Sequence, residues 1–373
     1  NLAYLWGDVP LFLHAEQPAD IYKPRTPVAQ IWEQVIADFT AATALPKRSE
    51  YSEEDTGRVT SGAAYAMLGR TYWYNRDFEN AYKMLYVLVE GEQKGEYELD
   101  PDFATQWLNP NSNLRESIFE IQYVTNGKNW DASTGWNGVW FIPSSDGGYG
   151  FHLPTQHLLD AFDPEDPRIT WTFVRQGDQF VGNDFVTGDA NYPSRFFDRK
   201  HFVPMSETLN AASPVYPQDV EMTVYVIRYA DVLLMYAEAC LEKGDIVGAR
   251  KYLNQVRKRA RESSPLDAKR VIQKYVPDTK PTSLPDITSD NVAEVRLAIW
   301  NERRFEFACE GIRRMDLMQQ ERYGEIMAAV YSNGYATEDV DKGRYYTKER
   351  ELFPIPQNDI DLSRGALVQN PGY

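Results

Sequence analysis

The sequence lacks the features of a fold held by many disulfides and those of a membrane-spanning protein. Its 373 residues include two cysteines, Cys240 and Cys309, which excludes a disulfide-rich scaffold and a cysteine-based zinc site. Both lie in apolar, helical-looking stretches, so we expect buried free thiols. No run of about 18 apolar residues, the length that a transmembrane helix needs, occurs in the chain.

Cationic side chains are scarce relative to anionic ones. The chain has 39 lysines and arginines against 55 aspartates and glutamates, which gives a formal net charge of −16. Such a negative field repels nucleic-acid phosphates and anionic lipid surfaces. The charge balance therefore argues against nucleic acid and against an anionic membrane surface as partners.

Catalytic, cofactor-binding and metal-binding motifs are also lacking. No GxSxG, GxxxxGK[ST], GxGxxG, HExxH or EF-hand pattern occurs, so we expect no cofactor. The four histidines are scattered and predict no metal site: His14, His152, His157 and His201. A calcium ion held by the acids of residues 163–166 remains an alternative.

What the chain does contain is helical periodicity in two similar pairs of segments, residues 60–91 and 229–260. Each pair carries two small residues twelve positions apart: Gly69 and Ala81 in the first, Ala237 and Ala249 in the second. Small residues at these positions let paired helices approach closely. The spacing resembles the tetratricopeptide repeat, a helix hairpin that stacks on its neighbours.

The remaining patterns predict a mostly α fold with a large loop-rich part. Helical portions at about 27–91 and 224–320 flank a portion at about 92–223 that is rich in glycine, asparagine, aspartate and proline. Within that portion, residues 117–124 alternate as a strand does. We expect a single domain over residues 1–373 whose loop-rich portion faces the ligand.

Aromatic residues are abundant, at 13% of the chain, and some of them follow no helix or strand period. Residues 125–150 interleave large aromatics with small polar residues: Trp130, Trp136, Trp140 and Tyr149. Flat rings cover the C–H face of a sugar while nearby amides and carboxylates bind its hydroxyls, so this mixture suits a carbohydrate site. The alternative is that the tryptophans pin a long loop to the body of the protein.

Three acids extend the apolar stripe of a helix predicted over residues 291–320: Glu302, Glu306 and Glu310. A glycosidase needs two facing carboxyl groups, and a buried acid can serve as one. The same helix carries four arginines close by: Arg303, Arg304, Arg313 and Arg314. Because buried acids require partners, the sequence favours a structural ion-pair network over catalysis.

Several motifs, in order along the chain, resemble those of the SusD/RagB family. They are residues 6–11 (WGDVPL), 57–64 (GRVTSGAA), 116–123 (ESIFEIQY), 228–239 (RYADVLLMYAEA), 301–317 (NERRFEFACEGIRRMDL), 352–356 (LFPIP) and 369–373 (QNPGY). The resemblance covers essentially the whole chain. It implies tetratricopeptide-type hairpins beneath a loop-rich ligand face, and no catalytic activity.

The resemblance also implies a place in nutrient uptake at the outer membrane of Gram-negative bacteria. Family members are surface-exposed lipoproteins that capture glycans and pass them to a SusC-like TonB-dependent transporter. They carry a lipid-modified cysteine and a further stretch before the WGDVPL turn, and both are absent from this chain. A peptide-binding RagB-type member and a glycan-cleaving enzyme remain as alternatives.

Four further ligand candidates rank below the aromatic loop. Trp6 and Asp8 would lie beside the stretch that precedes the WGDVPL turn in the family. Arg168 and Trp171 follow the turn DPEDPR.

Overall fold

The computed structural model describes most of the chain outside a set of gaps. The described residues are 1–17, 21–108, 111–123, 140–141, 149–175, 196–201, 221–263, 266–267, 270–274, 284–332 and 346–373.

The chain forms two compact units, each made of segments that are distant in sequence. Unit 1 comprises Asn1–Ala44, Tyr74–Arg76 and Ile312–Tyr373, and unit 2 comprises Leu45–Trp73 and Asp77–Gly311. The two units do not coincide with the helical and loop-rich portions expected from the sequence. The assignment of one domain over residues 1–373 stays a prediction.

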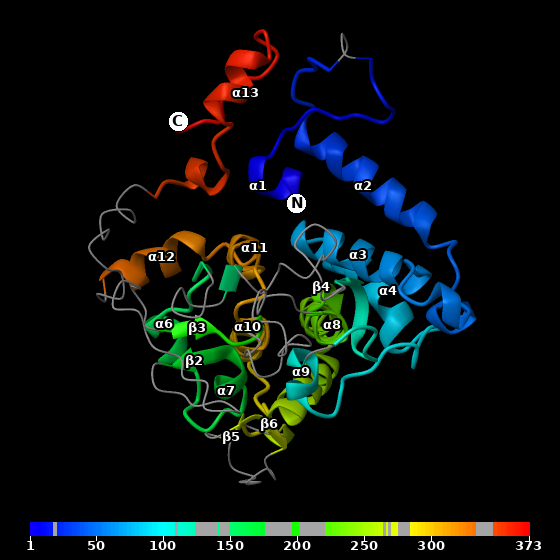
Figure 1. Ribbon diagram of the computed structural model, residues 1–373, viewed down its shortest axis with the longest axis vertical. Coiled ribbons are helices and arrows are strands. Elements are labelled where there is room, and N and C mark those ends of the chain that lie inside the picture. The colour runs from blue at the N-terminus through cyan, green and yellow to red at the C-terminus, as the bar shows by residue number, and fades with distance from the viewer. Residues whose placement is uncertain are drawn as a thin grey trace, which may run out of the picture. The chain divides into compact units, whose positions relative to one another are not determined.

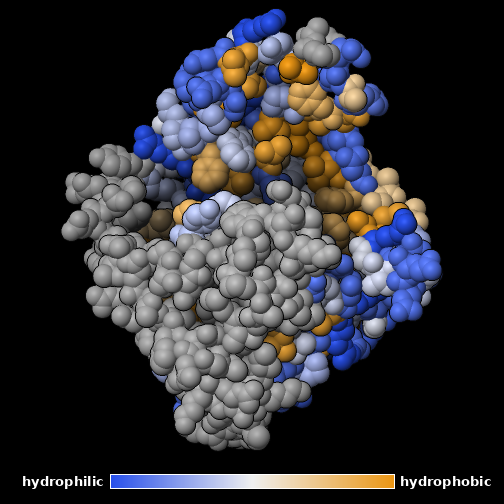
Figure 2. All heavy atoms as spheres, in the orientation of Figure 1, coloured by the Kyte–Doolittle hydropathy of each residue, from blue (hydrophilic) through white to orange (hydrophobic). Residues whose placement is uncertain are grey.

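Unit 1 brings the two ends of the chain together around Arg25. Its guanidinium donates hydrogen bonds to the backbone oxygens of Trp6 (2.9 Å) and Val368 (3.0 Å). The helices of this unit are α1 (Leu2–Trp6), α2 (Val28–Ala42), α11 (Arg313–Gln319), α12 (Tyr323–Ser332) and α13 (Gln357–Leu362), with a 3₁₀ turn at Lys348–Glu351. On the face drawn in Figure 2, hydrophobic residues gather over α1 and α2. The helix α2 buries Ile31 and leaves its other apolar side chains partly exposed.

Unit 2 is built on a group of helices that lie side by side, with α8 at their centre (Figure 1). They are α3 (Ser61–Tyr74), α4 (Phe78–Val89), α8 (Tyr229–Glu242), α9 (Ile246–Glu262) and α10 (Val292–Glu306). Every residue of α8 from Tyr229 to Leu241 is buried. Both predicted helix hairpins, α3–α4 and α8–α9, are thereby confirmed.

The hairpins follow from the small residues and from caps at the turns. A Cβ atom on Gly69 would lie inside van der Waals contact with Leu85 of α4, so this position needs glycine. The side chain of Asp77 caps α4 by accepting from the Asn80 N–H, and Asp245 caps α9 in the same way. Each hairpin therefore combines a close approach of two helices with a capped second helix.

Short antiparallel strand pairs complete the described part of unit 2. The pairs are β1 (Ser117–Ile121) with β4 (Val224–Arg228), β2 (Phe173–Arg175) with β3 (Phe196–Asp198), and β5 (Leu266–Asp267) with β6 (Arg270–Lys274). The short helices are α6 (Gln156–Leu159) and α7 (Arg168–Thr172), with 3₁₀ turns at Arg48–Glu50, Glu53–Asp55 and Phe103–Trp107. The predicted strand at 117–124 is confirmed in β1.

Two sequence predictions need correction. Residues 291–320 form two helices, α10 and α11, because Cys309 and Gly311 take positive φ angles of 65° and 78° that end the helical path between them. Helical structure begins at Tyr229 and not at Val224, since β4 comes first. Among the described helices, none combines the length and apolar character that crossing a bilayer requires.

Candidate functional site

Three exposed aromatic side chains lie together on the surface of unit 2. Trp140, Tyr149 and Phe151 are 45%, 51% and 53% exposed. The ring of Phe151 stacks on Trp140 at 5.7 Å between centroids and on Tyr149 at 5.9 Å, each with an interplanar angle of 20°. We call these three residues the aromatic platform.

The platform is anchored at its base to β3. The Phe151 N–H donates to the Trp140 carbonyl at 2.7 Å, which brings the two ends of the intervening segment together. The adjacent Phe141 packs on His201 with centroids 4.7 Å apart, and His152 lies 3.2 Å from a carboxylate oxygen of Asp198. The two residues next to the platform in sequence therefore tie it to the end of β3.

Exposed aromatic rings in contact with one another suit the binding of a flat apolar surface. Grouped large apolar side chains at a protein surface commonly mark an interaction site, whereas single ones are ordinary. Tyrosine and tryptophan combine an apolar ring with a polar atom that can bond a wet ligand. The platform can thus stack on a ligand while its hydroxyl and indole groups contact polar atoms.

The structure brings together two of the four aromatic residues predicted from the sequence, Trp140 and Tyr149. The other two, Trp130 and Trp136, lie outside the described residues. Phe151 was not among the predicted contacts, since it follows Gly150 just beyond the predicted loop. Its proximity to Tyr149 was the signal that could have included it.

Trp6 and Asp8 belong to unit 1, where both have structural contacts. The Trp6 indole donates to the Pro354 carbonyl at 3.2 Å, and the ring meets Phe353 edge-on. The Asp8 carboxylate accepts from the Val28 N–H at 2.7 Å, at the first residue of α2. Their role in ligand binding stays a prediction.

Arg168 and Trp171 are buried, which corrects their proposed role as ligand contacts. The Arg168 side chain is 0% exposed and binds three carboxylates. Trp171 packs in an apolar cluster with Phe103 and Trp107. Neither side chain reaches the surface in this structure, since α7 buries both of them together with Ile169 and Thr172.

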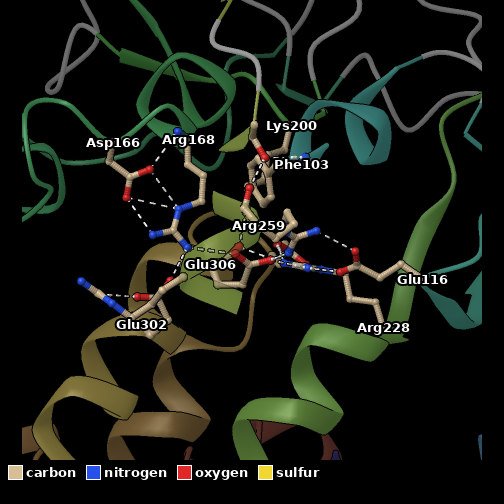
Figure 3. Close-up of polar contacts among 12 residues, drawn as sticks. Phe103, Glu116, Asp166, Arg168, Lys200, Arg228, Arg259, Glu302 and Glu306 are labelled. Carbon is tan, nitrogen blue, oxygen red and sulfur yellow. Dashed lines mark hydrogen bonds and ion pairs between the residues drawn. The ribbon is translucent and has the colours of Figure 1, made fainter. Parts of the chain in front are cut away.

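Arg168 belongs to a buried ion-pair network in unit 2 (Figure 3). In the part of the chain that the structure describes, the network joins five cations, Arg168, Lys200, Arg228, Arg257 and Arg259, to five carboxylates, Glu116, Asp166, Glu302, Glu306 and Glu310. Its formal charge is therefore zero, which is the condition for burying so many ions.

Glu306 lies at the centre of this network, as Figure 3 shows. Burial alone would raise the pKa of this carboxyl, but the guanidiniums of Arg259, Arg228 and Arg168 outweigh burial and hold the pKa well below its usual range. A glycosidase acid needs the opposite, a carboxyl that stays protonated near neutral pH. The predicted structural role of the acids on this helix fits the geometry.

The partners of these acids differ from those expected. The sequence favoured Arg303, Arg304, Arg313 and Arg314, whereas the network uses arginines from α7, β4 and α9. Arg303 binds Asp231 of α8 at 2.7 Å instead, and Arg304 donates to His157. The pairing is set by elements that meet only in the folded chain.

Comparisons with known proteins agree on one family. The family model described as the SusD family matches residues 115–373. A SusD-like protein from Formosa agariphila, P2, is 24% identical over 386 residues, which cover all of this chain and 71% of that protein. A SusD-like protein of Bacteroides ovatus is 25% identical and covers 98% of this chain and 70% of its own length.

Solved structures share the fold. A SusD superfamily protein from Bacteroides vulgatus superposes with a TM-score of 0.74 at 24% identity, covering all of this chain and 74% of that one. Surface glycan-binding protein A from Bacteroides thetaiotaomicron, solved in complex with laminarihexaose, has a TM-score of 0.72 at 22% identity and covers 100% and 75% of the two chains. Since the family model matches more than half of the residues, this chain belongs to the SusD family.

Proposed function

We propose that this chain binds a glycan on the aromatic platform and delivers it to a SusC-like TonB-dependent transporter at the surface of the outer membrane. The observation that carries the proposal is the platform itself, formed by Trp140, Tyr149 and Phe151.

Family membership supports this reading. Membership of the SusD family and the likeness to a surface glycan-binding protein of Bacteroides uniformis support a carbohydrate-binding protein that is not an enzyme and is associated with the outer membrane. The resemblance of the sequence motifs to the SusD/RagB family supports two further parts of the proposal, the transporter partner and the exposure at the cell surface. Trp130 and Trp136 remain proposed contacts, because they shortly precede Trp140 in sequence.

The chemistry of the platform fits a neutral sugar. Aromatic rings cover the apolar face of a pyranose, and such binding depends little on salt because a neutral ligand has no charge to screen. We expect dissociation constants in the micromolar to millimolar range, which correspond to roughly 4–8 kcal/mol.

Calorimetric titration against a panel of polysaccharides tests the proposal. Trp140→Ala and Phe151→Ala should each weaken binding by about 2 kcal/mol, as at other binding hot spots. Tyr86→Ala is the matched control, since Tyr86 is an aromatic residue of α4 that is 43% exposed and lies outside the platform. Thermal melting should stay near wild type for all three variants.

The result that would contradict the proposal is a glycan that binds the wild type and both platform variants equally. Binding to extended peptides and to none of the glycans would favour a RagB-type function in its place. New reducing ends during incubation would indicate glycan cleavage.

A further inference from the structure

Two histidines that are distant in sequence meet at one buried carboxylate beneath the aromatic platform. The Nδ1 atoms of His152 and His201 lie 3.2 Å and 2.7 Å from the same oxygen, Oδ2 of Asp198. One ligating atom from each of the three residues can be chosen so that all lie within 4.8 Å of one another. The sequence predicted no metal site because 49 positions separate the two histidines.

We propose that His152, Asp198 and His201 form a binding site for a divalent transition-metal ion of the zinc class. Two imidazole nitrogens and one carboxylate oxygen are one of the ligand sets that zinc takes in sites with three protein ligands. The proposal does not depend on the glycan-binding function.

Two of the separations between ligand atoms lie near those of such a site. Ligands at about 2.0–2.1 Å from a tetrahedral metal lie about 3.3 Å from one another. The separation between His152 Nδ1 and Asp198 Oδ2 is already close to that value. The His201 contact needs to widen by roughly half an ångström, which a small rotation of the ring supplies.

Surrounding groups hold the three residues in place, as outer partners of a metal site do. The Lys200 N–H donates to Oδ1 of Asp198 at 2.9 Å, which fixes the carboxylate and leaves Oδ2 to the histidines. Phe141 packs against both imidazole rings, with centroids 4.7 Å from His201 and 5.8 Å from His152.

The nearby charged side chains permit a bound cation. The ammonium group of Lys200 is directed to Glu310 Oε1 at 2.7 Å and to the Glu306 carbonyl, and hydrogen-bonds there. Asp198 itself has an exposed fraction of 0%, while the side chain of His152 is 43% exposed. An ion can therefore enter from the solvent side, past His152, and meet the carboxylate behind it.

A metal at this position would clamp the platform. His152 follows Phe151 directly, and Asp198 is the last residue of β3. A bound metal ion would therefore join the platform segment to β3 by coordination bonds.

Binding of Zn²⁺ and Co²⁺ to tag-free protein at pH 7.5 tests the proposal. We expect one equivalent of Zn²⁺ in calorimetry, a higher melting temperature with Zn²⁺, and visible absorption typical of tetrahedral Co²⁺. His152→Ala should weaken Zn²⁺ binding at least tenfold, because loss of even an outer partner costs about 10–100-fold. It should still fold, since the side chain is partly exposed.

His14→Ala is the matched control, because His14 is exposed and lies in unit 1; it should bind Zn²⁺ as the wild type does. Ca²⁺ should not compete, since it prefers oxygen ligands. His201→Ala provides a second loss of ligand. If the wild type shows neither the Co²⁺ absorption nor a higher melting temperature with Zn²⁺, the proposal is wrong. The three residues would then be joined by hydrogen bonds alone. Equal Zn²⁺ binding by the wild type and by His152→Ala would overturn the proposal as well.

Discussion

Replacing Arg168 by methionine removes a fully buried cation at one end of the ion-pair network. Its guanidinium lies 2.7 Å from Asp166, 2.7 Å from Glu302 and 2.9 Å from Glu306. After the substitution Glu302 keeps Arg257 and Glu306 keeps Arg228 and Arg259. Asp166 loses the cation that the structure pairs with it.

The cost follows from this one stranded carboxylate. Breaking a buried pair by removing one partner costs about 3–5 kcal/mol, because the remaining charge stays desolvated. Domains are stable by only about 5–15 kcal/mol, so Arg168→Met removes a large share of the total. Adding Asp166→Asn to the variant removes the stranded charge, and the double variant should be more stable than Arg168→Met alone.

Urea unfolding followed by circular dichroism measures these changes, provided that the slopes are equal among the variants. The control is Arg58→Met, since Arg58 pairs with Asp55 at 2.7 Å on the surface and its side chain is 70% exposed. An exposed pair contributes about 0–1 kcal/mol. If Arg168→Met unfolds at the same urea concentration as Arg58→Met, the reasoning about the buried network is wrong.

Two further predictions concern the packed helices of unit 2. Glu238 accepts from the indoles of Trp73 and Trp300, and burial raises its pKa to about 7 from 4.5. Because the folded-state pKa lies above the unfolded one, the stabilising contribution of the Glu238 carboxyl is fully present below pH 4.5, and up to about 3 kcal/mol of it is lost as the pH rises through 7. Urea unfolding at pH 5 and pH 8 should show a larger loss in the wild type than in Glu238→Gln. Gly69→Ala should cost about 1–3 kcal/mol by forcing Leu85 aside, and an unchanged melting temperature would contradict the close packing of α3 on α4.

The helix hairpins could be predicted because their signals are local. Gly69 and Ala81 are twelve residues apart, and the caps at Asp77 and Asp245 lie within the turns they stabilise. The break between α10 and α11 escaped prediction because the residues around Cys309 keep a helical pattern. The left-handed conformation at Cys309 becomes visible only in three dimensions.

The candidate site was predicted in part, for a related reason. The aromatic character of Trp140 and Tyr149 is a property of sequence, and it identified the segment. Their contact with Phe151, and the meeting of His152 with His201 at Asp198, depend on how the segment folds back onto β3. Likewise no pattern near Arg168 indicates that two of its partners, Glu302 and Glu306, lie on α10.

The ion-pair network also bears on the order in which the chain folds. Its contacts join residues far apart in sequence: 134 positions for Arg168 with Glu302, 112 for Arg228 with Glu116 and 78 for Arg228 with Glu306. Closing such long loops costs entropy before any contact forms, whereas the hairpins α3–α4 and α8–α9 close over short turns. We therefore expect the hairpins to form early and the network to assemble after the rate-limiting step. Substitutions in the network should then accelerate unfolding and leave the refolding rate nearly unchanged. The network would thus contribute to kinetic stability, because it slows the unfolding of the native state.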